Sequence, residues 1–155
     1  MNPNMRKKNK MILAGVSGAG NETAEIWKRF MKLDEEHTLI NKLSDDGYEV
    51  RISDSATGYE KVFVGCEVKD AKVDCGEYEI LQIPSSEYAS FDVYVADGYE
   101  SENNAMSEWL ISNEKGYVNN LFEGKQYCVE HYDARFNGDA DDSIVEIWLP
   151  VKKDK

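Results

Sequence analysis

The chain has 155 residues, enough for one domain with a real core, and its hydrophobic content of 41% predicts a folded globule rather than a disordered chain. Thirty acidic residues against 18 basic ones leave a net charge of -12, which disfavours direct binding to nucleic acid or to an anionic membrane. No apolar run is long enough to span a bilayer and the first ten residues lack the apolar centre of a signal peptide, so we expect a cytoplasmic protein without a membrane partner.

The first half of the chain predicts a strand, a helix and two further strands. Residues 1–10 form a basic, Asn-rich tail that we expect to be disordered, and residues 11–16 follow as an apolar strand. Asn21 is the expected cap of a helix that the Ser-Asp-Asp-Gly turn at residues 44–47 ends, with a kink or interruption at the acidic run of residues 34–36 as the alternative. Residues 48–52 and 59–68 are expected strands. The expected apolar face of this helix consists of Ile26, Trp27, Phe30, Met31, Ile40 and Leu43.

The second half repeats this order after an extra strand at residues 78–83. A strand at 88–95 precedes a helix that begins at Ser101, and two strands, 126–132 and 144–151, complete the chain. We therefore predict an α+β fold in which two tandem strand-helix-strand-strand units are related by a pseudo-twofold axis around a central ligand cleft. The single domain would cover residues 11–153, with halves at about 11–70 and 76–151. The alternative is one α+β core with no pocket.

One carboxylate interrupts the apolar strand at residues 144–151. Glu146 shares a strand face with Trp148, because side chains alternate between the two faces of a sheet. A buried carboxylate without a partner is costly, so Glu146 must reach water at a sheet edge, pair with Lys61 or Arg135, take the neutral protonated form, or meet a cationic ligand. Alternation leaves open whether Glu146 faces the cleft or the opposite side of its sheet.

The cysteines and histidines predict no reactive or metal-binding centre. Cys66, Cys75 and Cys128 form no Cys-x-x-Cys pair, while His37 and His131 are isolated in the sequence. We therefore expect reduced thiols, no bound metal and no cofactor.

Four segments, in their order and spacing, resemble a known family. They are ILAGVS at residues 12–17 before the helix with Ile26-Trp27 and Phe30, IPSSEYASF at residues 83–91, the helix with Trp109-Leu110, and VEIWLPV at residues 145–151. Together they resemble the effector-binding domain of bacterial AraC-type and MerR-type multidrug regulators, which also occurs in free-standing gyrase-inhibitor-like (GyrI-like) proteins. The resemblance covers nearly the whole chain after the first ten residues.

The resemblance implies a tandem fold with a ligand in its central cleft, where a glutamate neutralises lipophilic cations. By resemblance, Glu146 is the candidate for this glutamate, and Trp148 and Trp109 are candidates for aromatic walls of the cleft. An aromatic face attracts a cation, so other aromatic residues are further candidates for ligand contacts, although core packing is the alternative for each of them. These further candidates are Tyr59, Phe63, Tyr88 and Tyr127.

Three functions are compatible with this sequence. We expect a free-standing small-molecule binding protein, a sensor or sequestering module for hydrophobic, cationic compounds. Only residues 1–10 precede the first expected strand, too few for the helix-turn-helix domain of a transcription regulator. The alternatives are an interaction protein whose partner is a topoisomerase or a transcription regulator, and a hydrolase of strained electrophilic molecules that uses Glu146 as its base. We expect binding rather than catalysis.

Overall fold

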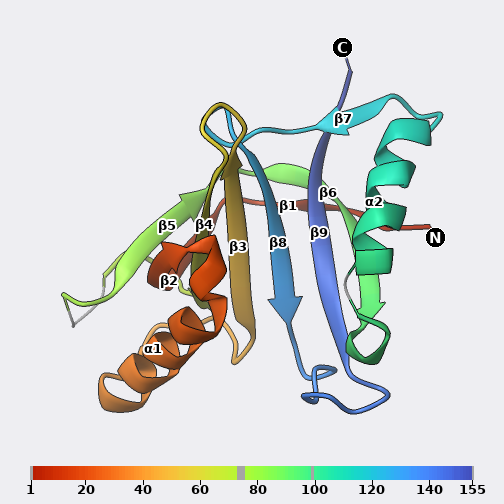
Figure 1. Ribbon diagram of the computed structural model, residues 1–155. Coiled ribbons are helices and arrows are strands. Elements are labelled where there is room, and N and C mark those ends of the chain that lie inside the picture. Colours follow the sequence, from red (N-terminus) through yellow and green to blue (C-terminus); the bar gives the residue numbers. More distant parts are fainter. Residues whose placement is uncertain (1, 73–75, 99, 155) are drawn as a thin grey trace.

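The computed structural model describes residues 2–72, 76–98 and 100–154, and within them the chain forms one antiparallel nine-stranded sheet and two α-helices (Figure 1). The strand order is β1-β6-β9-β8-β3-β4-β2-β5, and β7 pairs with the end of β9. The helices are α1 (Thr23–Glu36) and α2 (Glu100–Ser112). The strands are β1 (Asn4–Lys8), β2 (Met11–Ala19), β3 (Gly47–Asp54), β4 (Tyr59–Glu67), β5 (Glu79–Ile83), β6 (Ser86–Tyr94), β7 (Tyr117–Asn119), β8 (Gln126–Tyr132) and β9 (Ile144–Lys153).

The predicted α+β class is confirmed, and the differences from the expected elements are local. Residues 4–8, expected in a disordered tail, form β1 and pair with β6. The first helix ends at Glu36, at the acidic run of residues 34–36, and does not continue to the turn at residues 44–47. In the segment that follows, the Asp34 carboxylate accepts a hydrogen bond from the Leu39 amide (3.2 Å) and pairs with Lys42 (2.7 Å). Ile40, expected on the helix face, is therefore 81% exposed. Cys75, expected as a reduced thiol, lies outside the described residues.

The register of five neighbouring strands assigns every central side chain to one of two faces. Directly paired residues share a face, so the row Val64, Glu49, Glu130, Ile147 and Phe91 runs across β4, β3, β8, β9 and β6 on one side of the sheet. The neighbouring row belongs to the other side. Its members are Gly65, Tyr48, His131, Glu146 and Asp92.

Both helices pack on the face that carries Val64 and Ile147 (Figure 1). Ile26, Phe30 and Leu33 of α1, spaced about one turn apart, are buried against β2 and β4. Met106 of α2 is buried against β6 and β9. The centre of this face, over β3 and β8, lies between the two helices. Neither described helix is long and apolar enough to cross a bilayer.

The opposite face forms a separate, aromatic core. Leu13 of β2 and Ile83 of β5 belong to the same buried cluster as Tyr88 of β6 and Trp148 of β9, although these strands lie in opposite halves of the strand order. The sheet must therefore curl around this cluster. We call this side the helix-free face.

Close approach of β2 and β4 depends on two glycines that face each other. Gly15 pairs with Gly65, and a Cβ atom at Gly15 would collide with the backbone carbonyl oxygen of Val64. We predict that Gly15→Ala lowers the free energy of unfolding by more than about 2 kcal/mol, because backbone cannot move aside as a flexible side chain can. Thermal and urea denaturation measure this loss. Gly76→Ala is the matched control, since a Cβ there meets no atom within 4 Å. Equal stability of the two variants would contradict the proposed packing.

Candidate functional site

A cleft of about 650 Å³ lies between α1 and α2, above β3 and β8. Met106 and Leu110 of α2, together with Ile147 and Leu149 of β9, supply the apolar part of its lining. Polar residues of β3, β4, β8 and the two helices supply the rest. They include Thr23, Glu49, Arg51, Ser53, Glu60, Asn103, Ser107, Gln126, Glu130 and Tyr132. The cleft has the size and the mixed lining typical of small-molecule sites.

Two glutamates meet on the floor of the cleft. Glu49 of β3 and Glu130 of β8 are directly opposite in the register, and both carboxylates contact Nε of Arg51, at 2.9 and 3.4 Å. Glu49 is 2% exposed and accepts a second hydrogen bond from the Trp27 indole (2.7 Å). Glu130 accepts a hydrogen bond from the Tyr132 hydroxyl (2.8 Å). Glu49 is thus fully engaged by protein donors, whereas the Glu130 side chain keeps 13% of its surface exposed.

The cleft carries more negative than positive charge. Glu49, Glu60 and Glu130 face one guanidinium, and Arg51 is the sole cationic side chain among the described residues that line the cleft. Burial, reinforced by the neighbouring charge of Glu49, raises the pKa of Glu130 to about 7. A positively charged group in the cleft would relieve this repulsion and favour the ionised form of Glu130.

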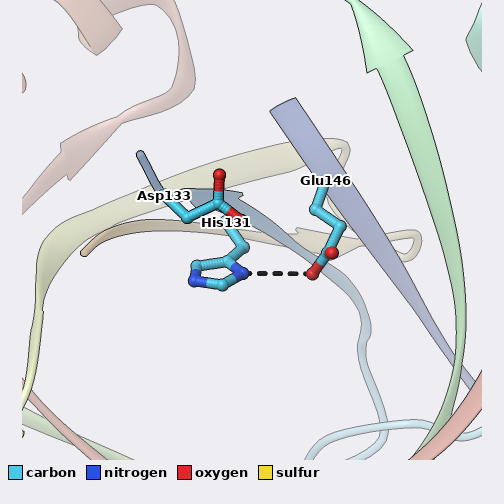
Figure 2. Close-up of side chains that lie close together, drawn as sticks. All are labelled: His131, Asp133 and Glu146. Atoms are coloured by element: carbon cyan, nitrogen blue, oxygen red, sulfur yellow. Dashed lines mark hydrogen bonds and ion pairs between the residues drawn. The ribbon is translucent and has the colours of Figure 1, made fainter. Parts of the chain in front are cut away.

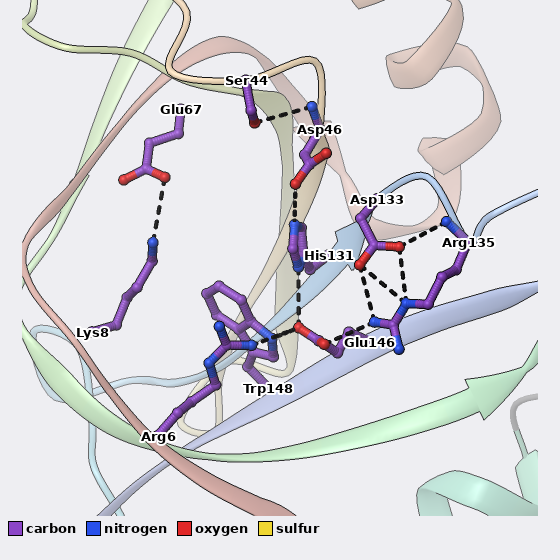
Figure 3. Close-up of polar contacts among 10 residues, drawn as sticks. All are labelled: Arg6, Lys8, Ser44, Asp46, Glu67, His131, Asp133, Arg135, Glu146 and Trp148. Atoms are coloured by element: carbon purple, nitrogen blue, oxygen red, sulfur yellow. Dashed lines mark hydrogen bonds and ion pairs between the residues drawn. The ribbon is translucent and has the colours of Figure 1, made fainter.

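The structure places Glu146 outside this cleft, on the helix-free face. Its strand neighbour Ile147 lines the cleft, so alternation directs Glu146 to the other side of β9. There its carboxylate accepts hydrogen bonds from Arg6 (2.9 Å), from Arg135 (2.8 Å) and from the Trp148 indole (2.6 Å) (Figure 3). The pairing with Arg135, one of the alternatives from the sequence, is therefore present.

His131 completes the surroundings of Glu146. Its Nδ1 lies 3.1 Å from Glu146 and its Nε2 lies 2.7 Å from Asp46, and only the imidazolium form donates to both carboxylates (Figure 3). Burial opposes this charge, but the two hydrogen bonds outweigh it and raise the pKa of His131. The hydrogen bond with His131, helped by Trp148 and Arg6, lowers the pKa of Glu146 to about 2. Glu146 is thus a fully compensated carboxylate.

The predicted aromatic residues do not gather around one ligand site. Phe63, Tyr88 and Trp148 are buried in the core of the helix-free face, where the Tyr88 hydroxyl hydrogen-bonds that of Tyr127 (3.0 Å). Tyr127 also contributes to the lining of the cleft. Trp109, a residue of α2, packs against aromatic rings of the sheet. Its ring centroid lies 5.8 Å from that of Phe91 and 6.2 Å from that of Tyr117. Tyr59 is 55% exposed and lines a second cavity of about 600 Å³.

His131, Asp133 and Glu146 have the residue types of a metal site, and their candidate ligand atoms lie within 4.8 Å of one another (Figure 2). Two arginines already satisfy the carboxylates, however. Arg135 binds Asp133 through Nε (3.1 Å) and Nη2 (3.0 Å), and it reaches Glu146 as well. A divalent cation would have to displace these ion pairs and the proton on His131, so we read the cluster as an ion-pair network.

Sequence reasoning missed Glu49 and Glu130 as site residues. Both lie in strands that the sequence predicts, and Glu130 shares a polar strand face with Gln126, Cys128 and Tyr132. That polar face was the available signal, because a polar strand face between two helix-covered apolar regions needs either water or a ligand. The pairing of β3 with β8, which brings the two glutamates together, has no local signature.

The whole chain has recognisable relatives. The family model described as Cass2, integron-associated effector binding protein, matches residues 6–151. The chain belongs to this family. The resemblance to GyrI-like effector-binding domains is thereby confirmed, and membership indicates a small-molecule binding protein. A search of curated proteins finds no match to the sequence.

Several solved structures share the fold. SAV2435 bound to tetraphenylphosphonium has a TM-score of 0.73 and 17% identity, over 98% of this chain and 94% of that one. The C-terminal domain of EcmrR has a TM-score of 0.70 and 11% identity, over 98% of both chains. An integron cassette protein from Vibrio cholerae has a TM-score of 0.60 and 14% identity, over 98% of this chain and 97% of that one. At these identities the likeness is one of fold.

The raised pKa of Glu130 has a consequence for stability. A carboxyl with a folded-state pKa above its ordinary value of 4.5 contributes stability below pH 4.5, and this contribution is lost as the pH rises through about 7. We predict that Glu130→Gln unfolds several degrees above the wild type at pH 8, since each kcal/mol is worth about 2–4 °C in a domain of this size. Near pH 5 the two should converge. Glu25→Gln, an exposed control, should leave the unfolding temperature unchanged at both pH values. A Glu130→Gln variant less stable than the wild type at pH 8 would contradict the repulsion.

Glu146 should behave in the opposite way. Its folded-state pKa of about 2 lies below 4.5, so its contribution to stability is present above pH 4.5 and is lost as the pH falls towards 2. We predict that Glu146→Gln lowers the free energy of unfolding by about 2 kcal/mol or more at pH 7, because several charged donors lose their acceptor. The difference from the wild type should shrink as the pH is lowered from 4.5. Denaturation curves at pH 3, 5 and 7 measure it, and a constant difference would contradict the assignment.

Proposed function

We propose that this protein binds small organic cations with an apolar body in the cleft between α1 and α2, with Glu130 as the carboxylate that faces the ligand. The observation that carries the proposal is the charge imbalance on the floor of the cleft, where three glutamates face Arg51. Every donor group that the structure records on Arg51 already serves Glu49, Glu60, Glu130 or Thr23, so Arg51 is not available to neutralise a further anion. A bulky, weakly hydrated cation suits such a site because it loses little solvation on entry.

The apolar residues that line the cleft support the proposal that the ligand has an apolar body. Met106 and Leu110 on α2 lie across the cleft from the strand residues that carry the carboxylates. Met is flexible and polarisable, which favours binding of ligands of different shapes. SAV2435, which shares the fold, is known bound to the lipophilic cation tetraphenylphosphonium. The repeated strand-helix-strand-strand arrangement on either side of the cleft is part of the same proposal.

Hydrolysis in the cleft is a second candidate function. The observation that favours it is the pairing of Glu130, with a pKa raised to about 7, with the Tyr132 hydroxyl at 2.8 Å. A carboxylate with a pKa near the working pH suits a general base that activates water. Glu130 would then replace Glu146 as the base of the hydrolase considered from the sequence.

Calorimetric titration with tetraphenylphosphonium and with neutral triphenylphosphine oxide tests the binding proposal. We expect saturable binding of the cation with an affinity that increases as the pH rises through about 7, because Glu130 must lose its proton to pair with the cation. Glu130→Gln should weaken the cation about tenfold or more at pH 8 and should leave the neutral compound little changed.

Glu146→Gln is the matched control for this titration. Because Glu146 lies on the opposite face, the variant should keep wild-type affinity for the cation. Loss of binding in Glu146→Gln with retention in Glu130→Gln would return the site to the residue that the family resemblance implied. Equal losses for the cationic and the neutral compound would contradict a charge-based site.

A further inference from the structure

The two edges of the sheet differ in how they are protected against a further strand. β1 is one edge and β5 is the other, and in the described part of the chain β5 pairs with β2 alone (Figure 1). Three consecutive cationic residues, Arg6, Lys7 and Lys8, lie in β1, and charges of this kind oppose pairing between sheet edges. β5 has the sequence EILQI, in which Glu79 is the one charged residue. β5 is therefore the edge that can accept another strand.

The hydrogen bonds of β2 show which way its backbone groups point. Along a strand, the N–H and C=O groups of successive residues point alternately to the two neighbouring strands. The carbonyl of Ile12 accepts a hydrogen bond from the Val68 amide (2.9 Å), so the even-numbered residues of β2 direct these groups to the side of β4. Its odd-numbered residues direct them to β5. The hydrogen bond from the Ser17 amide to the Glu79 carboxylate (3.0 Å) agrees with this direction.

The same alternation identifies the free backbone groups of β5. Leu13 is an odd-numbered residue of β2 and pairs with Leu81, so these two residues exchange backbone hydrogen bonds. The neighbours of Leu81 in β5 are Ile80 and Gln82, and their N–H and C=O groups point to the opposite side, the free edge of the sheet. Two donors and two acceptors are thus available there for a further strand.

A hollow beside β5 leaves room for such a strand. Ile80, Leu81 and Gln82 all line the second cavity, of about 600 Å³. Successive side chains of a strand point to opposite faces, so a cavity that touches all three residues lies along the edge of β5 rather than above one face. Its other wall consists of the hairpin between β3 and β4 and the turn at residues 122–125. Neighbouring strands of a sheet need a spacing of only about 4.8 Å.

The sequence of β5 suits pairing with an antiparallel copy of itself. A twofold axis at Leu81 places Ile80 opposite Gln82 of the second copy, and Gln82 opposite the second copy's Ile80. Both are hydrogen-bonded pairs, because the backbone groups of these two residues point to the free edge. Each Glu79 lies opposite an apolar residue, so no like charges meet. The same operation on β1 would place Arg6 opposite Arg6.

We propose that the free edge of β5 is a dimer interface, at which a second copy of this chain adds its own β5 in antiparallel orientation. The two sheets then form one continuous sheet. This interface does not depend on the function proposed for the cleft. One short strand makes most of the contact and each chain has a net charge of -12, so we expect a weak dimer that becomes tighter as salt screens the repulsion.

Sedimentation equilibrium of the wild type, from micromolar to millimolar concentration, tests the proposal. We expect the molar mass to rise from that of one chain to twice that value, and to rise earlier at high salt. Gln82→Pro removes an N–H from the free edge but no hydrogen bond to β2, and it should weaken the dimer about tenfold or more, because the twofold axis repeats the loss.

Gln82→Thr is the matched control, since it changes the same side chain and keeps the N–H group. It should dimerise like the wild type. Two results would overturn the proposal. One is a wild type that stays monomeric at millimolar concentration, and the other is equal dimerisation of the proline and threonine variants.

Amide hydrogen exchange of the wild type covers the case in which Gln82→Pro does not fold. Labelling at low and at high protein concentration, read out by NMR, should slow the amides of Ile80 and Gln82 about tenfold or more at high concentration. The Leu81 amide, bonded to β2, should exchange slowly at both. Concentration-independent exchange of Ile80 and Gln82 would overturn the proposal. Slow exchange at both concentrations would show that the chain covers this edge itself, and fast exchange at both that the edge is open to a strand of another protein.

Discussion

The antiparallel register across β4, β3, β8, β9 and β6 decides which chemistry lies on which side of this protein. It aligns Glu49 with Glu130 on the side of the helices, and it aligns His131 with Glu146 on the helix-free face. Neighbouring residues of one strand thus lie on opposite faces of the sheet, in different surroundings, because side chains alternate along a strand. A shift of one residue between β8 and β9 would exchange the two environments. Both the cleft and the arginine network therefore depend on one pairing.

The two faces solve the problem of a buried carboxylate in opposite ways. Glu146 is surrounded by donors from Arg6, Arg135, His131 and Trp148, and its pKa falls to about 2. Glu130 shares one guanidinium with Glu49, and its pKa rises to about 7. The first arrangement is already complete and stabilises the fold. The second is left incomplete on the floor of the cleft, which is the condition under which a cationic ligand gains most from binding.

Most elements of the fold could be predicted from local patterns, but the site could not. The alternation at residues 59–68 and 144–151 predicted β4 and β9 closely. β1 was missed because its charged residues gain their partners, Glu146 and Trp148, only in the folded protein. Likewise, Glu146 is conspicuous in an apolar sequence, whereas Glu130 lies in a strand of mixed polarity. Which of the two glutamates faces the cleft depends on the pairing of strands that are far apart in the sequence. A local stretch of sequence carries no information about that pairing.

The function proposed for the cleft requires that Glu130 be an under-neutralised carboxylate that a cation completes. A ¹³C NMR titration of the Glu130 side-chain carboxyl measures its pKa directly. It is made in the free protein and in the protein saturated with tetraphenylphosphonium. We expect a pKa near 7 in the free protein and a clear decrease in the presence of the cation. A carboxyl that titrates near 4.5 in both states would show that the cleft holds no such group.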